Sequence, residues 1–344
     1  MPPMAITKIA RLVALVAMIA VGNLGCLQKN ANEVIVYTAL DREFSDPVFE
    51  DFTAATGIRV LPKFDTESTK TVGLYNAIAA ESNRPRCDVF WNNEILNTLR
   101  LQQANLLANY DSTEAAAFPA MYRDTGGAWH GFAARARVLI INNDLVKTED
   151  RPDSVLDLAD PKWKNRIGMA KPLFGTTASH AAVLFERLGT EPAKEFFTKV
   201  HGNAQVLAGN KRVAVAVARG QLDWGITDTD DAMIELEKGM PVSIIYPDQQ
   251  DDQMGTLFIP NCVSIIEGAP NRQSAEKLVD YLLTGAVEAK LAAGPSAQIP
   301  LRTDNETRAR VESPSTVKAM TVDFLAAALQ WDEAADFLHE LFAQ

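Results

Sequence analysis

Three aspartates stand close together where a predicted strand gives way to a predicted helix. Asp228, Asp230 and Asp231 follow the mostly apolar segment 222–226 and precede the segment 233–239, which is typical of a helix that ends at a glycine. One carboxylate can cap such a helix, and a second can interact favourably with its dipole. A third brings like charges together, which is costly unless a cation or a donor-rich ligand neutralises them. Ligands of open α/β sheets bind at this edge, so we expect a binding site here.

A second group of residues is suited to an anion. Gly175, Thr176 and Thr177 come before the predicted helix 181–188, and the free N–H groups at the start of a helix can bind anions. A glycine and a threonine that merely cap the helix would give the same sequence, so both interpretations stay open. Asn210 lies in a predicted turn between a strand and a helix, at the same ligand-binding edge.

Two arginines lie within the long extended segment 131–142. Arg135 and Arg137 are two residues apart, so on a strand they share one face. They fit a solvated strand edge and, equally, an anion or carboxylate partner at a junction between two parts of the fold. Arg135 is favoured as the ligand because it lies nearer to the point where the segment is expected to cross.

The elements that must position these side chains alternate between strands and helices. Strands are predicted at 33–38, 58–61 and 87–91, and a helix follows each of them. This rhythm predicts a parallel sheet covered by helices. Polar side chains follow the strand ends, among them Asp41, Asn93 and Glu94.

Two long extended segments, 131–142 and 256–266, are interpreted as crossings between two lobes. The sequence therefore predicts a two-lobed α/β clamshell in which each lobe holds a mostly parallel sheet flanked by helices, with the ligand-binding edges facing one cleft. The predicted boundaries are a first lobe of residues 33–134 and 260–312, a second lobe of residues 135–259, and C-terminal helices over 313–344 that pack on the second lobe.

The composition argues against several classes of function. The 344 residues carry a formal net charge of −11, which disfavours binding to nucleic acid. A hydrophobic fraction of 47% with 22% charged residues is typical of a globular chain. The sequence has neither the G-x-S-x-G nor the H-E-x-x-H motif of hydrolases, and its four histidines are scattered. We therefore expect a binding protein, with no catalytic residues and no catalytic cofactor.

The N-terminus has the pattern of an export signal. Lys8 and Arg11 precede the apolar segment 12–21, which is too short for a comfortable membrane span. Small residues and Cys26 follow, in an arrangement similar to a bacterial lipoprotein box. Residues 1–26 are therefore predicted to be a signal peptide, and lipid attachment at Cys26 and ordinary cleavage nearby both stay open.

Two further cysteines, Cys87 and Cys262, lie at the starts of predicted strands. An exported protein can keep a disulfide, so a bond between them is one alternative. Two buried free thiols are the simpler interpretation and the one we favour.

Beyond these local patterns, the sequence resembles the extracellular solute-binding proteins of ABC importers, and among them the periplasmic ferric-ion-binding proteins. The resemblance runs from about residue 34 to about residue 301, and its most specific part is the segment 161–168. The other segments that carry it are 36–37, 52–60, 88–90 and 135–138. It implies the clamshell of a type 2 periplasmic binding protein, acting as a monomer that delivers its ligand to the membrane subunits of an ABC permease.

The resemblance also implies where a metal would bind. The iron-binding histidine of the family falls at Asp41, and its glutamate falls at Asn93, with Glu94 one place later. Its adjacent tyrosine pair falls at Asp230 and Asp231, where this chain has carboxylates instead of phenolates. Carboxylate oxygens suit a hard cation, ferric iron included, and also Ca²⁺ or Mn²⁺.

An anion pocket accompanies the iron in some members of the family. It resembles the Gly175–Thr177 turn with Asn210, and Arg135 matches an arginine that can hold the anion. The predicted metal ligands are thus Asp41, Glu94, Asp230 and Asp231, and the other predicted ligand contacts are Asn93, Arg135, Gly175, Thr176, Thr177, Asn210 and Asp228.

Three functions remain in view. The first is capture of iron or a similar hard cation, with or without a bound anion, for delivery to a permease. The second is the same fold binding a phosphorylated sugar or a phosphonate, with the anionic end at Arg135, Thr176, Thr177 and Asn210. An exported hydrolase with paired carboxylates is the least favoured, because no nucleophile motif is present.

Overall fold

The computed structural model describes residues 32–65, 69–304 and 306–343. The predicted signal peptide and Cys26 lie outside the described residues. Within the described part of the chain, no helix combines the length and the apolar character that crossing a membrane requires.

The first lobe begins with the predicted alternation of strands and helices. Strand β1 lies between β2 and β3 and pairs in parallel with both, so that Tyr37 is opposite Phe90 in β3. Helix α2 ends at Gly57, whose φ of 70° is the left-handed conformation that closes a helix. The elements are β1 (Glu33–Thr38), α2 (Arg42–Thr56), β2 (Arg59–Phe64), α3 (Val72–Ala80), β3 (Val89–Asn92), α4 (Leu96–Gln103) and β4 (Leu107–Ala108).

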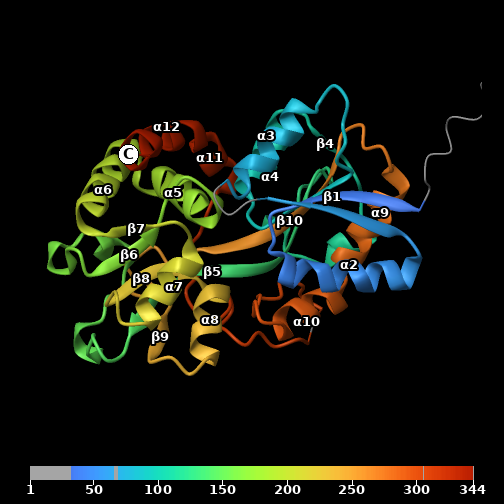
Figure 1. Ribbon diagram of the computed structural model, residues 1–344. Coiled ribbons are helices and arrows are strands. Elements are labelled where there is room, and N and C mark those ends of the chain that lie inside the picture. Colours follow the sequence, from blue (N-terminus) through green and yellow to red (C-terminus); the bar gives the residue numbers. More distant parts are fainter. Residues whose placement is uncertain (1–31, 66–68, 305, 344) are drawn as a thin grey trace, which may run out of the picture.

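The second lobe repeats this arrangement. Strand β6 lies between β7 and β8 and pairs in parallel with both, while β9 pairs with the long strand β5. Helices α5 to α8 lie around this half of the sheet (Figure 1). The elements are β6 (Ile167–Ala170), α5 (Gly175–Leu188), α6 (Thr190–Asn203), β7 (Gln205–Leu207), α7 (Asn210–Ala218), β8 (Trp224–Asp228), α8 (Thr229–Glu237) and β9 (Val242–Ile245).

Two long antiparallel strands join the lobes, as the sequence predicted. Strand β5 (His130–Asn142) pairs with β10 (Phe258–Ile266) over its first half and with β8 and β9 over its second. The strand order is β2-β1-β3-β10-β5-β8-β6-β7 (Figure 1). The α/β fold with two crossings is therefore confirmed, whereas the residues at which one lobe ends and the other begins stay predictions.

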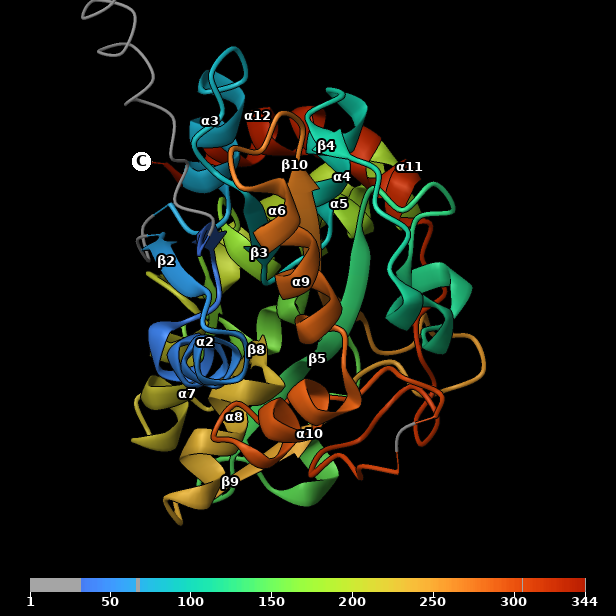
Figure 2. The same ribbon diagram turned by 90° about the vertical axis from the view of Figure 1, so that its right-hand side faces the viewer.

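The chain returns to the first lobe after β10. Helices α9 (Arg272–Leu282) and α10 (Gly285–Ala293) lie on this lobe, as Figure 2 shows in a view onto it. The last two helices are α11 (Phe324–Leu329), which packs on both α4 and α5, and α12 (Trp331–Phe342), which packs on α5 and α6. Helix α11 therefore touches both lobes.

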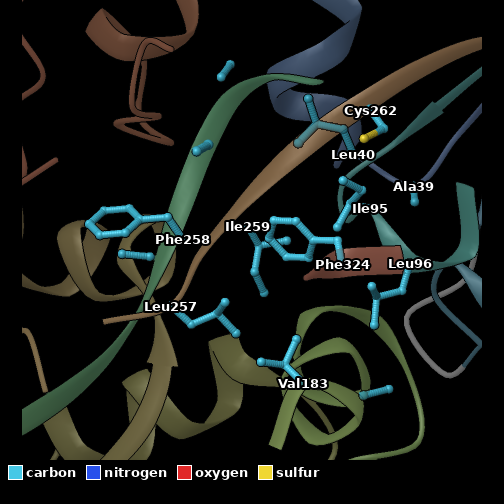
Figure 3. Close-up of a cluster of buried hydrophobic side chains, with 14 of the residues drawn as sticks. Ala39, Leu40, Ile95, Leu96, Val183, Leu257, Phe258, Ile259, Cys262 and Phe324 are labelled. Carbon is cyan, nitrogen blue, oxygen red and sulfur yellow. The ribbon is translucent and has the colours of Figure 1, made fainter. Parts of the chain in front are cut away.

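A buried apolar cluster lies where the lobes meet beside β10 (Figure 3). Ile95 and Leu96 at the start of α4, Val183 of α5 and Phe324 of α11 are all buried there. Burial of one such side chain contributes roughly 1.5–3 kcal/mol. The cluster therefore brings side chains of α4, α5 and α11 together beside β10.

Both internal cysteines are free and buried, as expected. Cys87 lies just before β3, and its thiol donates a hydrogen bond to the Val89 carbonyl. Burial raises the pKa of both thiols well above the ordinary value. Neither thiol is therefore a reactive nucleophile at neutral pH.

Candidate functional site

A cavity of about 670 Å³ lies between the lobes. The first lobe contributes residues that follow β1 and β3 and the residue Lys70 before α3, whereas the second contributes the first turns of α5, α7 and α8. Each predicted site residue except Glu94 lines it. The polar lining residues include Asp41, Lys70, Asn93, Arg135, Gly175, Thr176, Thr177, Asn210, Asp228, Asp230 and Asp231.

The three aspartates of the second lobe form one cluster. Asp228 is the last residue of β8, and Asp230 and Asp231 lie in the first turn of α8. One carboxylate oxygen of each lies within 4.8 Å of those of the other two. Burial raises the pKa of Asp230, with Arg135 opposing the shift, and burial with the charges of Asp230 and Asp228 raises the pKa of Asp231 further. The cluster therefore favours a bound cation or proton.

Asp228 acts as a brace within this cluster. Its carboxylate accepts hydrogen bonds from Arg137 Nη1 at 2.6 Å, Thr176 Oγ1 at 2.5 Å and Asn210 Nδ2 at 2.9 Å. It makes no side-chain cap bond to α8, although a capping aspartate was one interpretation of the sequence. Asp228 therefore ties the starts of α5, α7 and α8 to β5, and a ligand would have to share oxygens that these donors already occupy.

Arg135 faces Asp230 and has capacity for a further partner. Its Nη1 lies 3.6 Å from the Asp230 carboxylate, and the side chain is almost fully buried. Burial alone lowers the pKa of Arg135, but the charges of Asp230 and Asp228 outweigh it, so the pKa is raised and the guanidinium stays charged. Among the described residues, its Nε and Nη2 groups have no hydrogen-bond acceptor. A buried donor without a partner is costly, so these two groups suit an anion.

The start of α5 lies on the same wall of the cavity. The helix begins at Gly175, six residues earlier than predicted, and Gly175 has a φ of 55° that favours glycine. Thr177 Oγ1 donates to Asn210 Oδ1 at 3.1 Å, which orients the amide at the start of α7. Asn210 is the first residue of that helix and not part of a preceding turn. Thr176, Thr177 and Asn210 are thus connected by hydrogen bonds and line the same cavity as Arg135.

The first lobe presents a carboxylate, an amide and a lysine. Asp41, at the start of α2, pairs with the Lys70 ammonium at 2.7 Å. Asn93 is buried, and no described residue donates to its Oδ1. Lys70 is not among the predicted site residues, because its segment has the pattern of the polar start of a helix and nothing in that pattern places the residue opposite Asp41.

Glu94 does not join the other carboxylates, which corrects the expectation that it is a metal ligand. It is fully buried and accepts hydrogen bonds from Asn92 Nδ2 at 2.7 Å, the Leu96 N–H at 2.5 Å and Ser179 Oγ at 2.7 Å. Glu94 is held away from the cavity because the free N–H groups at the start of α4 attract the nearest carboxylate. Asn93 is the residue of this pair that reaches the cavity.

The cavity therefore combines two kinds of binding group. Oxygen acceptors from Asp41, Asn93, Asp230 and Asp231 suit a hard cation. The Arg135 guanidinium and the first turn of α5 suit an anion. Such a site can hold a cation with an accompanying anion, or a small molecule that carries both charges.

Comparison with known proteins decides the family. The model of a family described as bacterial extracellular solute-binding proteins matches residues 97–328, which is more than half of the chain. The chain belongs to this family. Solute-binding proteins of this family bind small ligands or metal ions and work with ABC permeases, which are roles of binding and not of catalysis.

Individual relatives of this solute-binding protein are named for different ligands. It is 27% identical to the major ferric iron-binding protein of Neisseria meningitidis over 305 residues, which cover 84% of this chain and 88% of that protein. It is 25% identical to a putative 2-aminoethylphosphonate-binding periplasmic protein of Salmonella typhimurium over 272 residues, which cover 77% and 76%. The iron-bound HitA structure from Pseudomonas aeruginosa superposes with a TM-score of 0.81 at 22% identity, covering 90% of this chain and 99% of HitA. These matches confirm the two-lobed binding-protein fold.

Proposed function

We propose that this solute-binding protein captures a hard cation, ferric iron foremost, together with an anion, and delivers both to an ABC permease. The observation that carries the proposal is the position of Asp230 and Asp231 beside Arg135 in the cleft. Two carboxylates with raised pKa gain from a cation, and the guanidinium with unpartnered N–H groups gains from an anion. Relatives named for ferric iron support the choice of cation.

Closure of the lobes would bring the ligands together. Asp230 and Asp231 belong to the second lobe, whereas Asp41 and Asn93 belong to the first. A cation that binds groups from both lobes stabilises the closed form relative to an open one. Strands β5 and β10 are the hinge in this mechanism, because they are the two extended connections between the lobes.

The N-terminal sequence supports a proposal for where the protein acts. We propose that residues 1–26 direct export and that the protein acts as a monomer in the periplasm or on the cell envelope, anchored by lipid if Cys26 is modified. A relative described as periplasmic supports this location.

The experiment is native mass spectrometry with metal analysis on protein purified without a chelator. We expect a bound metal that is lost in the double variant Asp230→Asn, Asp231→Asn. The matched control is the double variant Asp251→Asn, Asp252→Asn. It also removes two negative charges, but from two consecutive, exposed aspartates that lie outside the cavity. A metal that survives loss of Asp230 and Asp231 would refute the cation site.

A second candidate is an organic ligand with both charges, such as a phosphonate that carries an amino group. The Asp41–Lys70 pair favours it, because a site in which one carboxylate already has an ammonium partner at 2.7 Å has less demand for a metal. The phosphonate would bind Arg135 and Thr177. Calorimetry with 2-aminoethylphosphonate tests this candidate, and full affinity in the Arg135→Ala, Thr177→Ala double variant would exclude it.

A further inference from the structure

Lys70 holds an unusual position between the two lobes. Its Nζ atom lies 2.7 Å from Asp41 Oδ1, its side chain lines the cavity, and it is only 19% exposed. Its main-chain carbonyl accepts a hydrogen bond from the Gly175 N–H of the second lobe at 3.1 Å. The backbone is thus attached to the start of α5 while the ammonium reaches back to the start of α2. Both attachments hold a positive charge at the place where a metal would meet the first lobe.

The side chains that line the cavity around Lys70 carry positive as well as negative charges. Among the described residues, six basic and five acidic side chains line the cavity. Asp228 is already paired with Arg137 at 2.6 Å. Of the other described carboxylates, Asp41 pairs with Lys70 and Asp230 lies beside Arg135. Asp231 lines the same cavity. A bare trivalent cation would therefore meet two fixed positive charges in a site of reduced dielectric, where charges interact strongly.

We propose that Lys70 determines the charge class of the ligand. Its tethered ammonium stands in for a cation beside Asp41, so the site accepts a hard metal ion only when that ion brings anionic ligands of its own. An anion that arrives with the metal pairs with Lys70 and Arg135 and cancels the repulsion between them and the metal. This inference rests on the proposed cation-binding function and adds to it a rule for rejecting bare ions.

The side chain of Lys70 can be tested apart from its backbone. Lys70→Met removes the charge and keeps a flexible, unbranched side chain, and the carbonyl bond to Gly175 stays available for closure. Lys70→Arg keeps the charge and serves as the matched control. Comparable thermal unfolding of the three proteins establishes that differences in binding do not reflect folding.

The probe is Tb³⁺, a hard trivalent ion, titrated by calorimetry as the chloride and, separately, as its preformed citrate complex. We expect wild type and Lys70→Arg to bind the citrate complex at least tenfold more tightly than the chloride. We expect Lys70→Met to bind the chloride at least tenfold more tightly than wild type does and to lose the preference for the complex.

Two outcomes would overturn the inference and separate it from the proposed function. If wild type binds Tb³⁺ chloride as tightly as Lys70→Met does, Lys70 does not set the charge class, while the cation site itself stands. If no variant binds Tb³⁺ in either form, the inference and the cation-binding function fail together, and the organic ligand becomes the better account of the cavity.

Discussion

Glu94 and Ser179 form a buried hydrogen bond across the two lobes, with Ser179 Oγ donating to Glu94 Oε2 at 2.7 Å. Glu94 belongs to the turn that begins α4, and Ser179 lies in α5. Among the described residues, the other hydrogen bonds that the Glu94 carboxylate accepts come from its own lobe, from Asn92, Leu96 and Asn97. The Ser179 bond therefore reports directly on whether these two helices are in contact.

Replacing Ser179 with alanine should shift the protein toward its open form. The variant leaves the Glu94 carboxylate with its local donors but removes the donor from the second lobe, and losing a hydrogen bond to a charged group costs about 1.5–3 kcal/mol. We expect ligand affinity to fall by about 10-fold or more, since 1.4 kcal/mol corresponds to a factor of ten. Small-angle scattering with calorimetry measures both effects.

Ser264→Ala is the control for this change. Ser264 is buried in β10, and its hydroxyl has no hydrogen-bond partner among the described residues. Removing that hydroxyl should leave both scattering and affinity unchanged. Equal behaviour of the two alanine variants would show that the contact between Glu94 and Ser179 does not influence closure.

Asp228→Asn should destabilise the folded protein rather than merely weaken binding. Arg137 is fully buried, and Asp228 is the carboxylate to which it is bonded, so the variant leaves a buried positive charge without its counter-ion. Breaking a buried pair in this way costs about 3–5 kcal/mol. Urea unfolding followed by circular dichroism measures the loss.

Glu195→Gln provides the comparison for a surface pair. Glu195 contacts Lys199 one turn along α6, and both side chains are mostly exposed. Solvent and salt screen an exposed pair of this kind, so its loss should barely move the unfolding midpoint. A similar small loss in Asp228→Asn would mean that Asp228 is not the brace of the site.

Arg135→Gln should weaken anion binding and raise the pKa of Asp230 further. Arg135 is the group that opposes the upward shift of the Asp230 pKa, and its Nε and Nη2 groups are the proposed anion donors. Charge-assisted hydrogen bonds contribute about 1.5–3 kcal/mol, so affinity for the anion should fall by roughly 10- to 150-fold. Calorimetry at fixed pH tests this, and an unchanged affinity would place the anion elsewhere.

Cation affinity should rise with pH, because protons and the cation compete for Asp230 and Asp231. Both carboxyl groups have pKa values raised above the ordinary value of 3.8, so the competition extends from that value up to the raised ones. Above this window affinity should level off. Titrations across a pH series check the prediction, and affinity that does not change with pH would contradict it.

The unliganded protein should show the opposite trend in stability. A carboxyl group whose pKa is higher in the folded state holds its proton more tightly there, so the free energy of unfolding falls as pH rises through the same window. Asp231→Asn removes this contribution. The variant should unfold at a higher temperature than wild type at neutral pH, and the difference should shrink as pH falls toward 3.8. A variant that is less stable than wild type at neutral pH would contradict the raised pKa.

The sequence by itself determined the elements and most of the lining of the cavity. Short, mostly apolar segments predict strands such as β1 and β8, because the strands of a parallel sheet are buried on both faces. The carboxyl ends of those strands share one edge, so Asp41, Asn93 and Asp228 could be placed at a common site before any contact was known. The family followed from longer segments.

Tertiary structure alone decided which groups are available to a ligand. Glu94 and Asn93 are adjacent in sequence, yet the first turns into the N–H groups of α4 and the second faces the cavity. Asp228 and Asp230 are two residues apart, yet one is taken up by Arg137, Thr176 and Asn210 while the other keeps capacity beside Arg135. Lys70 meets Asp41 only because the fold brings them together over 29 positions of the chain. The physical reason is that charge pairing acts through space, so it depends on distances that local residue patterns do not contain.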